Sequence, residues 1–390
     1  MNKYLIINTG SASKKYSLYE GKSELAFVHF ECEDGGHVVS FIKDGTTEKN
    51  KITEKEFDKS LDYLLNLLIK KTLVTSKEDF RGMGIRVVAP GLYFTEHRLI
   101  DDEYLKNIKK AGEKAPLHIE AIFEEIKKLK KFFGKKIPMC GVSDSVFHKN
   151  IPIKAKLYSI PLADTKKYEI YRYGYHGLSF QSIVGKLKDK NSLPSKMIVC
   201  HIGGGISITA IKDGKSIDTS MGFTPLEGMT MATRVGDIDS GAVIYLSEVS
   251  GLKGMKFRQY LNKNSGLFGL SGGVSGDVRD LLKIEYENSD AKNALDIYAY
   301  KIQKQIGAYV AVLGGVDSLV FSGTVGERSF KMRKRICDGL EVFGLKLDNS
   351  KNEITDRIDA VISTFDSKVK IEVIKTNEMK VIAEETEKLI

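Results

Sequence analysis

The stretch that decides the fold is Met197-Ile198-Val199-Cys200-His201-Ile202-Gly203-Gly204-Gly205-Ile206-Ser207-Ile208-Thr209-Ala210. It begins with a mostly apolar run, three glycines follow, and Ile206, Ile208 and Ala210 then alternate with other residues. Short apolar runs separated by a turn of small residues are typical of neighbouring β-strands. Asp213-Gly214 is a second turn signal, after which a third short run begins. The stretch therefore predicts three strands joined by two tight turns.

The N-terminal residues repeat this pattern. An apolar run, a small-residue turn, a second run, another turn and a third run lie at 5–8, 9–13, 15–19, 20–22 and 25–29. In the third run, Leu25, Phe27 and His29 alternate with other residues. Two copies of one supersecondary unit indicate an internal duplication. We therefore predict an α/β protein with two similar domains that face each other across a cleft.

Further segments fit this plan. Short apolar runs that predict strands lie at 83–88, 137–142, 318–322 and 371–376. The clearest helix is expected over 294–313, because apolar residues recur at helical spacing and Gly314-Gly315 ends the pattern. The domain boundary is expected near 147–152. We predict an N-terminal domain of residues 1–148, completed by a C-terminal helix at 377–390, and a C-terminal domain of residues 149–376.

The composition excludes several classes of protein. Of the 390 residues, 42% are hydrophobic and 28% are charged, which is ordinary for a globular protein and not for a disordered, collagen-like or membrane-spanning one. At roughly 150 residues per domain, this length predicts two or three domains. The formal net charge of +9 is compatible with an anionic substrate. The densest basic segment, 127–136, is interpreted as a solvated helix face and not as a nucleic-acid site.

Cysteine usage and the N-terminus bear on the compartment. Cys32, Cys140, Cys200 and Cys337 are widely spaced and include no C-x-x-C pair, so we expect reduced core residues. The apolar run at 4–8 is shorter than the core of a signal peptide. The sequence therefore predicts a cytoplasmic protein that neither spans nor binds a membrane.

Common nucleotide motifs are absent from the sequence, but three turns have the composition of phosphate-binding loops. The turn at 203–205 lacks the third glycine of a dinucleotide fingerprint, and no P-loop spacing occurs. However, small-residue turns follow apolar strands at 8–13, 203–205 and 322–327. Such turns expose successive backbone N–H groups that can hold phosphate oxygens. A plain hairpin is the alternative for any one turn, whereas three on a duplicated scaffold favour phosphate binding.

Five residues near these turns are candidates for chemistry. Arg86 lies inside an apolar strand and Arg234 lies in a glycine-rich loop. A charge in an apolar strand needs a carboxylate partner or an anionic ligand, and both explanations remain open for Arg86. His176, between glycines, is either a hydrogen-bonded core residue or a ligand contact. Asp144 and Glu378 follow strands, where they would hold a metal or cap a helix.

One longer motif identifies a family resemblance. The stretch Asp218-Thr219-Ser220-Met221-Gly222-Phe223-Thr224-Pro225-Leu226-Glu227-Gly228, which continues through Thr233-Arg234 to 236–239, resembles the acetokinase family of acetate kinases. Supporting matches cover nearly the whole chain, at 8–15, 86–88, 115–118, 144, 147–148, 173–179, 265–271 and 366–378. This family belongs to the superfamily of sugar kinases, actin and heat-shock ATPases. The resemblance therefore implies two duplicated actin-like, ribonuclease H-like domains, the C-terminal one binding nucleotide.

The resemblance also implies a reaction. This is the reversible transfer of the ATP γ-phosphoryl group to acetate or another short-chain carboxylate, giving an acyl phosphate and ADP, with Mg²⁺ or Mn²⁺ as the cofactor, in a homodimer. A carboxylate is already ionised at pH 7, so the nucleophile needs no general base. The obstacle is repulsion between two anions, which cationic donors at fixed positions relieve.

Roles follow from motif position. The expected catalytic residues are Arg86, Asp144, His176 and Arg234. The expected acyl-group contacts are Arg86, Val88, Leu117, Tyr175 and Pro225. The expected nucleotide-binding residues are Lys15, with Ser11 and Ser13 of the same loop, His201, Gly203, Gly204, Gly205, Asp277, Val278, Arg279, Gly323, Thr324, Val325, Gly326 and Arg328. The expected metal-side residues are Asn8 and Glu378.

Several positions depart from the family pattern. Ile85, Ala89 and Pro90 stand where the family has two histidines and a glycine, and Gly204 replaces an asparagine. Thr324 replaces a glycine of the adenosine turn, and its side chain is expected to narrow the purine slot.

These departures leave three functions open. They are an ATP-dependent acetate kinase, a kinase with a longer acyl chain or with pyrophosphate as donor, and a nucleotide-binding protein without turnover. Retention of Arg86 and Arg234 favours a kinase, because a binding module has no need of charge aimed at a transferring phosphoryl group.

Overall fold

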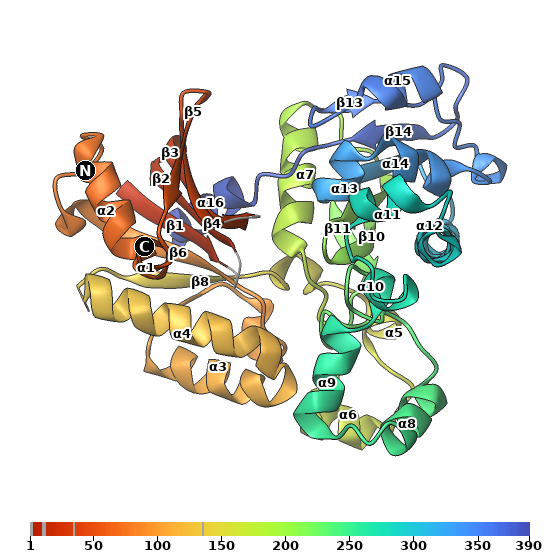
Figure 1. Ribbon diagram of the computed structural model, residues 1–390, viewed down its shortest axis with the longest axis horizontal. Helices are drawn as coiled ribbons and strands as arrows, with labels where there is room; N and C mark the ends of the chain where they lie inside the picture. The colour runs from red at the N-terminus through yellow and green to blue at the C-terminus, as the bar shows by residue number, and fades with distance from the viewer. Residues whose placement is uncertain (1–2, 10–12, 34–35, 135) are drawn as a thin grey trace. The chain divides into compact units, whose positions relative to one another are not determined.

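The computed structural model describes residues 3–9, 13–33, 36–134 and 136–390. The chain divides into two compact units, which we call unit 1 (Met1–Val146 with Asn377–Ile390) and unit 2 (Phe147–Thr376). Each unit contains a β-sheet with helices packed on it (Figure 1). The α/β class expected from the sequence is confirmed.

The described part of unit 1 holds an eight-stranded sheet in the order β5-β4-β3-β2-β1-β6-β8-β7. Its strands are β1 (Lys3–Thr9), β2 (Ser13–Glu20), β3 (Ser23–Glu33), β4 (Gly36–Lys43), β5 (Thr46–Ile52), β6 (Phe80–Val87), β7 (Arg98–Leu99) and β8 (Met139–Ser143). The first five strands form an antiparallel meander, whereas β6 runs parallel to both β1 and β8.

Unit 1 has five α-helices among its described residues, and three of them begin at a side-chain cap. They are α1 (Glu54–Asp58), α2 (Ser60–Lys70), α3 (Asp102–Lys114), α4 (Pro116–Phe133) and α16 (Glu378–Leu389). Thr53 and Glu56 form a capping box at α1, and Asp101 accepts from the Tyr104 N–H at α3. The lysines of α4 at 127, 128 and 131 are exposed, which confirms the solvated helix face.

Helix α16 returns from the far end of the chain to the sheet of unit 1. It packs against β1, β6 and β8. Glycine in β6 makes this close approach possible, because a Cβ at Gly84 would overlap the Thr386 hydroxyl of α16. The packing brings Glu378, the first residue of α16, to this sheet.

The described part of unit 2 holds a six-stranded sheet in the order β11-β10-β9-β12-β14-β13. Its strands are β9 (Lys196–Ile202), β10 (Ile206–Lys212), β11 (Lys215–Thr219), β12 (Ser318–Ser322), β13 (Ala360–Val361) and β14 (Lys370–Val373). Its helices are α5 (Ile153–Lys156), α6 (Leu162–Tyr168), α7 (Gly177–Asp189), α8 (Ser240–Val249), α9 (Gly254–Lys263), α10 (Gly266–Leu270), α11 (Val278–Ile284), α12 (Ser289–Leu313), α13 (Gly323–Arg328), α14 (Phe330–Cys337) and α15 (Asn349–Ile354).

Strand order shows the duplication directly. The antiparallel set β3-β2-β1 continues into parallel β6 and β8, just as β11-β10-β9 continues into parallel β12 and β14. The predicted internal repeat is therefore confirmed. Because parallel strands end at one edge of a sheet, side chains at the ends of β1, β6 and β8 come together.

The predicted helix at 294–313 is confirmed and extends further towards the N-terminus. Helix α12 begins at Ser289, because Asn288 caps it by accepting from the Ala291 N–H at 2.9 Å. It ends where Gly314 takes the left-handed conformation, with a φ of 65°. Its apolar stripe is buried, at Leu295, Tyr298, Ile302, Ile306, Tyr309 and Leu313.

Two sequence expectations need correction. Residues 323–328 form helix α13 and not an open turn, and the Glu327 carboxylate accepts from the Gly323 N–H at 3.2 Å. Cys32 is exposed, because β3 extends beyond the core after Phe30, whereas the other three cysteines are buried. In β3 the buried side chains are Ala26, Val28 and Phe30, and Leu25, Phe27 and His29 alternate with them. No helix among the described residues is long and apolar enough to cross a membrane.

Candidate active site

Four predicted site residues form one cluster in unit 1. Arg86 lies near the end of β6, Asp144 follows β8, and Glu378 begins α16. Arg86 Nη2 donates to Asp144 Oδ2 at 2.8 Å, and Arg86 Nη1 donates to Glu378 Oε2 at 3.0 Å. Asn8 of β1 donates from Nδ2 to the same Glu378 oxygen at 3.0 Å. The structure thus brings together expected catalytic and metal-side residues.

The carboxylates of this cluster keep Arg86 charged. Burial lowers the pKa of Arg86, but Asp144 and Glu378 raise it, and the net shift is upward. Of the two explanations for a charge inside an apolar strand, the structure contains the ion pair. Asp144 is only 1% exposed, so this ion pair is largely shielded from solvent.

The oxygen atoms of the cluster suit a magnesium ion. Asp144, Glu378 and Asn8 offer carboxylate and amide oxygens, which hard cations prefer. Within the described ranges, no three His, Cys, Asp or Glu side chains are grouped to hold a metal by themselves. Mg²⁺ commonly uses one or two carboxylates and completes its shell with water and phosphate oxygens. The donor set therefore fits Mg²⁺ that is bound together with a phosphate ligand.

Other predicted residues of unit 1 lie outside this cluster's hydrogen bonds. Lys15 of β2 is paired across the sheet with Asn8 and is half-buried. Val88 directly follows β6, and Leu117 is the second residue of α4, both half-buried. Ser11 lies outside the described residues.

In unit 2, Arg234 and His176 meet beside Gly205. A Cβ placed on Gly205 would lie 3.2 Å from Arg234 Nη1 and 3.4 Å from His176 Cε1. The glycine turn also contacts the loop that carries Arg234, because the Ala232 N–H donates to the Gly204 carbonyl at 3.2 Å. The structure therefore brings three predicted residues to one point.

Arg234 has no carboxylate partner among the described residues. Its Nη1 donates to the Pro225 carbonyl at 3.2 Å and lies 3.5 Å from the Met231 sulfur. Burial lowers the pKa of Arg234 and no neighbouring charge opposes this shift. A largely desolvated guanidinium without a counter-charge is energetically costly, and an anionic ligand would remove that cost.

His176 is held in a specific orientation. It has a left-handed backbone with a φ of 59° and immediately precedes α7. Its Nδ1 lies 2.8 Å from Ser207 Oγ, and its ring centroid lies 4.5 Å from that of His201. A non-glycine residue in this backbone region costs energy and is often found at functional sites. His201 Nδ1 in turn lies 3.3 Å from Ser322 Oγ.

A cavity of about 970 Å³ in unit 2 gathers most of the predicted nucleotide residues. Its walls include Gly203, Gly204, Asp277, Val278, Arg279, Thr324, Val325 and Arg328. The predicted residues His201, Gly205, Gly323 and Gly326 do not line it. The volume is within the range of small-molecule sites.

Sequence reasoning missed several walls of this cavity. The added basic residues are Lys283, Lys331 and Arg357, and the added aromatic ones include Tyr286 and Phe330. Together with Arg279 and Arg328, the three added basic residues give the cavity wall five basic side chains, compared with two acidic ones, Asp277 and Asp356. This excess of positive charge favours an anionic ligand. None of the added residues belongs to a motif; Lys283 lies on α11 and Lys331 on α14, whereas Arg357 lies outside both helices.

The two residues of unit 2 that are expected to contact the acyl group are both buried. Tyr175 is 1% exposed and its hydroxyl donates to the Phe223 carbonyl at 2.8 Å. Pro225 is buried, and its carbonyl accepts from Arg234. Both residues therefore support the segment that holds Arg234.

Comparison with known proteins identifies the family. The family model described as the acetokinase family matches residues 3–384. The chain belongs to the acetokinase family. Across its full length the chain is 41% identical to acetate kinase of Thermoanaerobacterium thermosaccharolyticum, covering 99% of that relative, and 40% identical to acetate kinase of Thermotoga maritima, covering 98% of it.

Solved structures of the acetokinase family share this fold. Acetate kinase of Porphyromonas gingivalis matches with a TM-score of 0.85 at 33% identity, and each chain is covered completely. A propionate kinase of Francisella tularensis matches with a TM-score of 0.88, also at 33% identity and with complete coverage of both chains. The resemblance to the family and the expected fold are both confirmed.

Proposed function

We propose that the protein reversibly transfers the γ-phosphoryl group of ATP to acetate, forming acetyl phosphate and ADP. Membership in the acetokinase family supports this reaction. The observation that carries the proposal is Arg234, a desolvated guanidinium without a carboxylate partner among the described residues, beside His176 and the glycine turn. Such a group suits a phosphoryl oxygen that gains negative charge during transfer.

Each side chain has a distinct role in the proposed reaction. Acetate is ionised at neutral pH, so the chemistry needs orientation and charge neutralisation and no base. Arg234 donates to the transferring group, and His176, oriented by Ser207, donates a further hydrogen bond. Arg86 binds an oxyanion and exchanges part of its pairing with Asp144 and Glu378 for it. The acyl contacts of Val88, Leu117, Tyr175 and Pro225 rest on the family motifs.

The nucleotide and the metal complete the proposal. The cavity walls at 277–279 and 324–328 hold the nucleoside part, and the turn at 203–205 holds phosphate oxygens. Asn8, Asp144 and Glu378 hold Mg²⁺, with Mn²⁺ as a substitute. When bound, the metal neutralises charge on the phosphate oxygens. The compartment that we propose for the protein is the cytoplasm.

A homodimer is part of the proposal, supported by an exposed apolar helix. No residue of α8 is buried, although its side chains include Ile244, Tyr245 and Val249, which are 60%, 66% and 59% exposed. A group of exposed apolar side chains on one helix is typical of a surface that another protein chain covers. Light scattering of the protein as it elutes from a size-exclusion column should give the molar mass of a dimer. The Tyr245→Asp variant should give that of a monomer. A monomeric wild-type protein at micromolar concentration would contradict this part.

A longer acid is the second candidate substrate. One structural neighbour is a propionate kinase, at the same identity as the acetate kinase compared above. One methylene in an apolar pocket changes selectivity by only about 1 to 3 kcal/mol, so both acids can be accepted.

The test is direct. The protein is incubated with Mg-ATP and formate, acetate, propionate or butyrate, and the acyl phosphate is trapped with hydroxylamine as a coloured hydroxamate. We expect product with acetate and ATP, less with butyrate, and none when pyrophosphate replaces ATP. Product formed with pyrophosphate but not with ATP would show that pyrophosphate is the phosphoryl donor. Absence of product with every donor and acid would contradict kinase function.

A further inference from the structure

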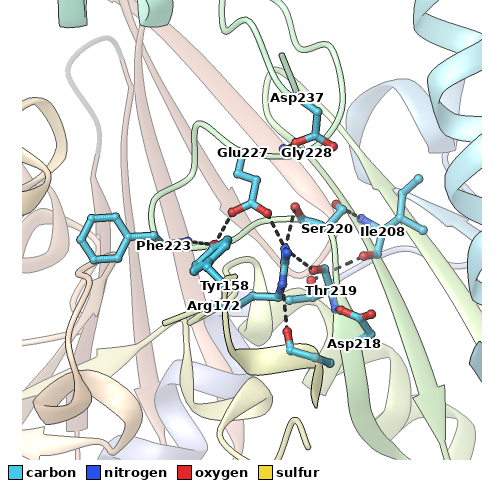
Figure 2. Close-up of polar contacts among 11 residues, drawn as sticks. Tyr158, Arg172, Ile208, Asp218, Thr219, Ser220, Phe223, Glu227, Gly228 and Asp237 are labelled. Atoms are coloured by element: carbon cyan, nitrogen blue, oxygen red, sulfur yellow. Dashed lines mark hydrogen bonds and ion pairs between the residues drawn. The ribbon is translucent and has the colours of Figure 1, made fainter. Parts of the chain in front are cut away.

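A second charged cluster lies in unit 2, outside the residues assigned above (Figure 2). Arg172 Nη2 and Glu227 Oε1 form an ion pair at 2.7 Å. The Tyr158 hydroxyl donates to the other Glu227 oxygen and accepts from the Phe223 N–H at 2.8 Å. Both carboxylate oxygens of Glu227 are therefore used. We call Tyr158, Arg172 and Glu227 the anchor cluster.

The anchor cluster fixes the backbone of the segment 219–228. Arg172 Nη1 donates to the carbonyls of Thr219 and Ser220, at 3.1 and 3.4 Å (Figure 2). The Glu227 carboxylate also packs directly on Gly222, where a Cβ would overlap it. This segment is thus held at its start, middle and end by one group of side chains.

That segment positions Arg234. The Gly228 N–H donates to Asp237 Oδ1 at 2.7 Å, and the Asp237 N–H donates to the Gly228 carbonyl at 2.7 Å. These two hydrogen bonds join the ends of the loop that carries Arg234. One of these ends, Gly228, directly follows Glu227. Within the segment, the Pro225 carbonyl accepts from Arg234 Nη1. A shift of the segment would therefore move both the loop base and the acceptor of the guanidinium.

The same cluster is linked to His176. Arg172 precedes His176 by four positions, and between them the Tyr173 N–H donates to the Gly222 carbonyl at 3.1 Å. The Arg172–Glu227 ion pair consequently joins the segment of His176 to that of Arg234.

The geometry points to Glu227 as a positioning residue for the phosphoryl-transfer reaction, acting through Arg234 and His176 by way of Arg172 and Tyr158. This inference rests on the proposed function. Glu227 pairs with Arg172 and accepts from Tyr158, and the residues that line the nucleotide cavity include no member of the anchor cluster. Its effect should therefore appear in the chemical step and not in nucleotide binding.

The first test separates chemistry from binding. Glu227→Gln keeps the shape and an acceptor for Tyr158 but loses the charge that pairs with Arg172. We expect kcat for acyl phosphate formation to fall about 10- to 100-fold, since misplacement of a catalytic group by about 1 Å has effects of this size. The Kd of Mg-ADP, measured by calorimetry, should change less than about threefold, because other residues line the cavity.

A matched control excludes a general effect of losing a glutamate that is paired with a cation and a hydroxyl. Glu372 of β14 is paired with Lys370 at 2.9 Å and accepts from the Ser318 hydroxyl at 2.9 Å, so it also combines a cation and a hydroxyl. Glu372→Gln should leave kcat unchanged even where it lowers the thermal midpoint. Tyr158→Phe is a milder second variant, expected to lower kcat about 3- to 10-fold through the loss of the hydrogen bonds of its hydroxyl with Glu227 and with the Phe223 N–H.

Coupling decides whether Glu227 acts through Arg234. In an Arg234→Ala background, Glu227→Gln should reduce the residual rate by less than about threefold, because Arg234 is gone and only the effect through His176 remains. The inference would be overturned if Glu227→Gln lowered the rate by the same factor with and without Arg234. An unchanged kcat in Tyr158→Phe would also overturn it. A wild-type protein that forms no acyl phosphate would instead contradict the proposed function, so the two failures are distinguishable.

Discussion

Arg86 and Glu378 are 292 positions apart in the chain, and an ion pair of 3.0 Å joins them. The contact forms because α16 returns to the sheet of unit 1 and places its first residue near the end of β6. The C-terminal helix therefore supplies a carboxylate of the proposed site as well as apolar packing.

Removal of Arg86 should damage both stability and activity. Arg86→Ala leaves Asp144 and Glu378 without their cation, and an unpaired buried charge costs about 3 to 5 kcal/mol of unfolding free energy. Acetyl phosphate formation should fall by roughly 10³-fold or more. Urea denaturation and the hydroxamate assay measure the two effects. A loss of activity below tenfold would remove Arg86 from the chemistry.

Arg234→Ala should have a different outcome. Arg234 has no carboxylate partner among the described residues and burial lowers its pKa, so removal of the charge relieves a desolvation cost. We expect an unchanged or higher thermal midpoint together with a loss of roughly 10³-fold or more in rate. A clear fall in the midpoint would show that Arg234 is a structural residue. Arg335→Ala is the control, because Arg335 pairs with Glu285 at 2.5 Å and its loss should lower the midpoint.

Much of the fold could be predicted from local patterns. The strand expected at 318–322 is β12 with the same bounds, because an apolar run ended by a glycine is an unambiguous signal. Helix α13 was missed because Gly323 and Gly326 suggest a turn, although the Gly323 N–H donates to the Glu327 carboxylate four positions further along the chain.

The site could be predicted residue by residue but not in its contacts. Arg86, Asp144 and Glu378 were singled out from strand ends and motifs, yet spacing alone did not show that they pair. The cavity walls Lys283 and Arg357 carry no motif and come together only through the packing of unit 2. Roles at the reacting atoms remain predictions.

Thr324 offers a test of the nucleotide site. It is exposed at the start of α13 and lines the cavity, where its side chain occupies space beside the expected purine. Thr324→Gly should lower the KM for ATP about two- to fivefold, because added room of this size changes binding by about 1 kcal/mol or less. Thr324→Ser, which removes only a methyl group, should have a smaller effect. An unchanged KM in both variants would show that Thr324 does not restrict the slot.

Glu125 should make the stability of unit 1 depend on pH. Burial raises the pKa of Glu125, although Lys14, Lys128 and the hydrogen bond from Tyr16 oppose the shift. A raised folded pKa means that the folded state binds more protons, so the unfolding free energy falls as pH rises from about 4.5 through the folded pKa. Each pKa unit corresponds to about 1.4 kcal/mol.

Glu125→Gln removes this ionisation. Relative to wild type, its urea midpoint should therefore rise between pH 4.5 and pH 7. Glu124→Gln is the control, because Glu124 is exposed and pairs only on the helix surface with Lys127. Parallel pH curves for wild type and Glu125→Gln would show that Glu125 is not the titrating group.

Glu378 should determine metal affinity. Its Oε2 accepts from both Asn8 and Arg86, so one carboxylate organises the oxygen cluster that fits Mg²⁺. Glu378→Gln should weaken Mn²⁺ binding, measured by electron paramagnetic resonance in the presence of ADP, by about 10- to 100-fold. Glu384→Gln on the same helix, where Glu384 pairs with Lys380 at 3.7 Å, should leave Mn²⁺ affinity unchanged. If Glu378→Gln binds Mn²⁺ as tightly as wild type, Glu378 serves to hold Arg86 and the metal is bound by other groups.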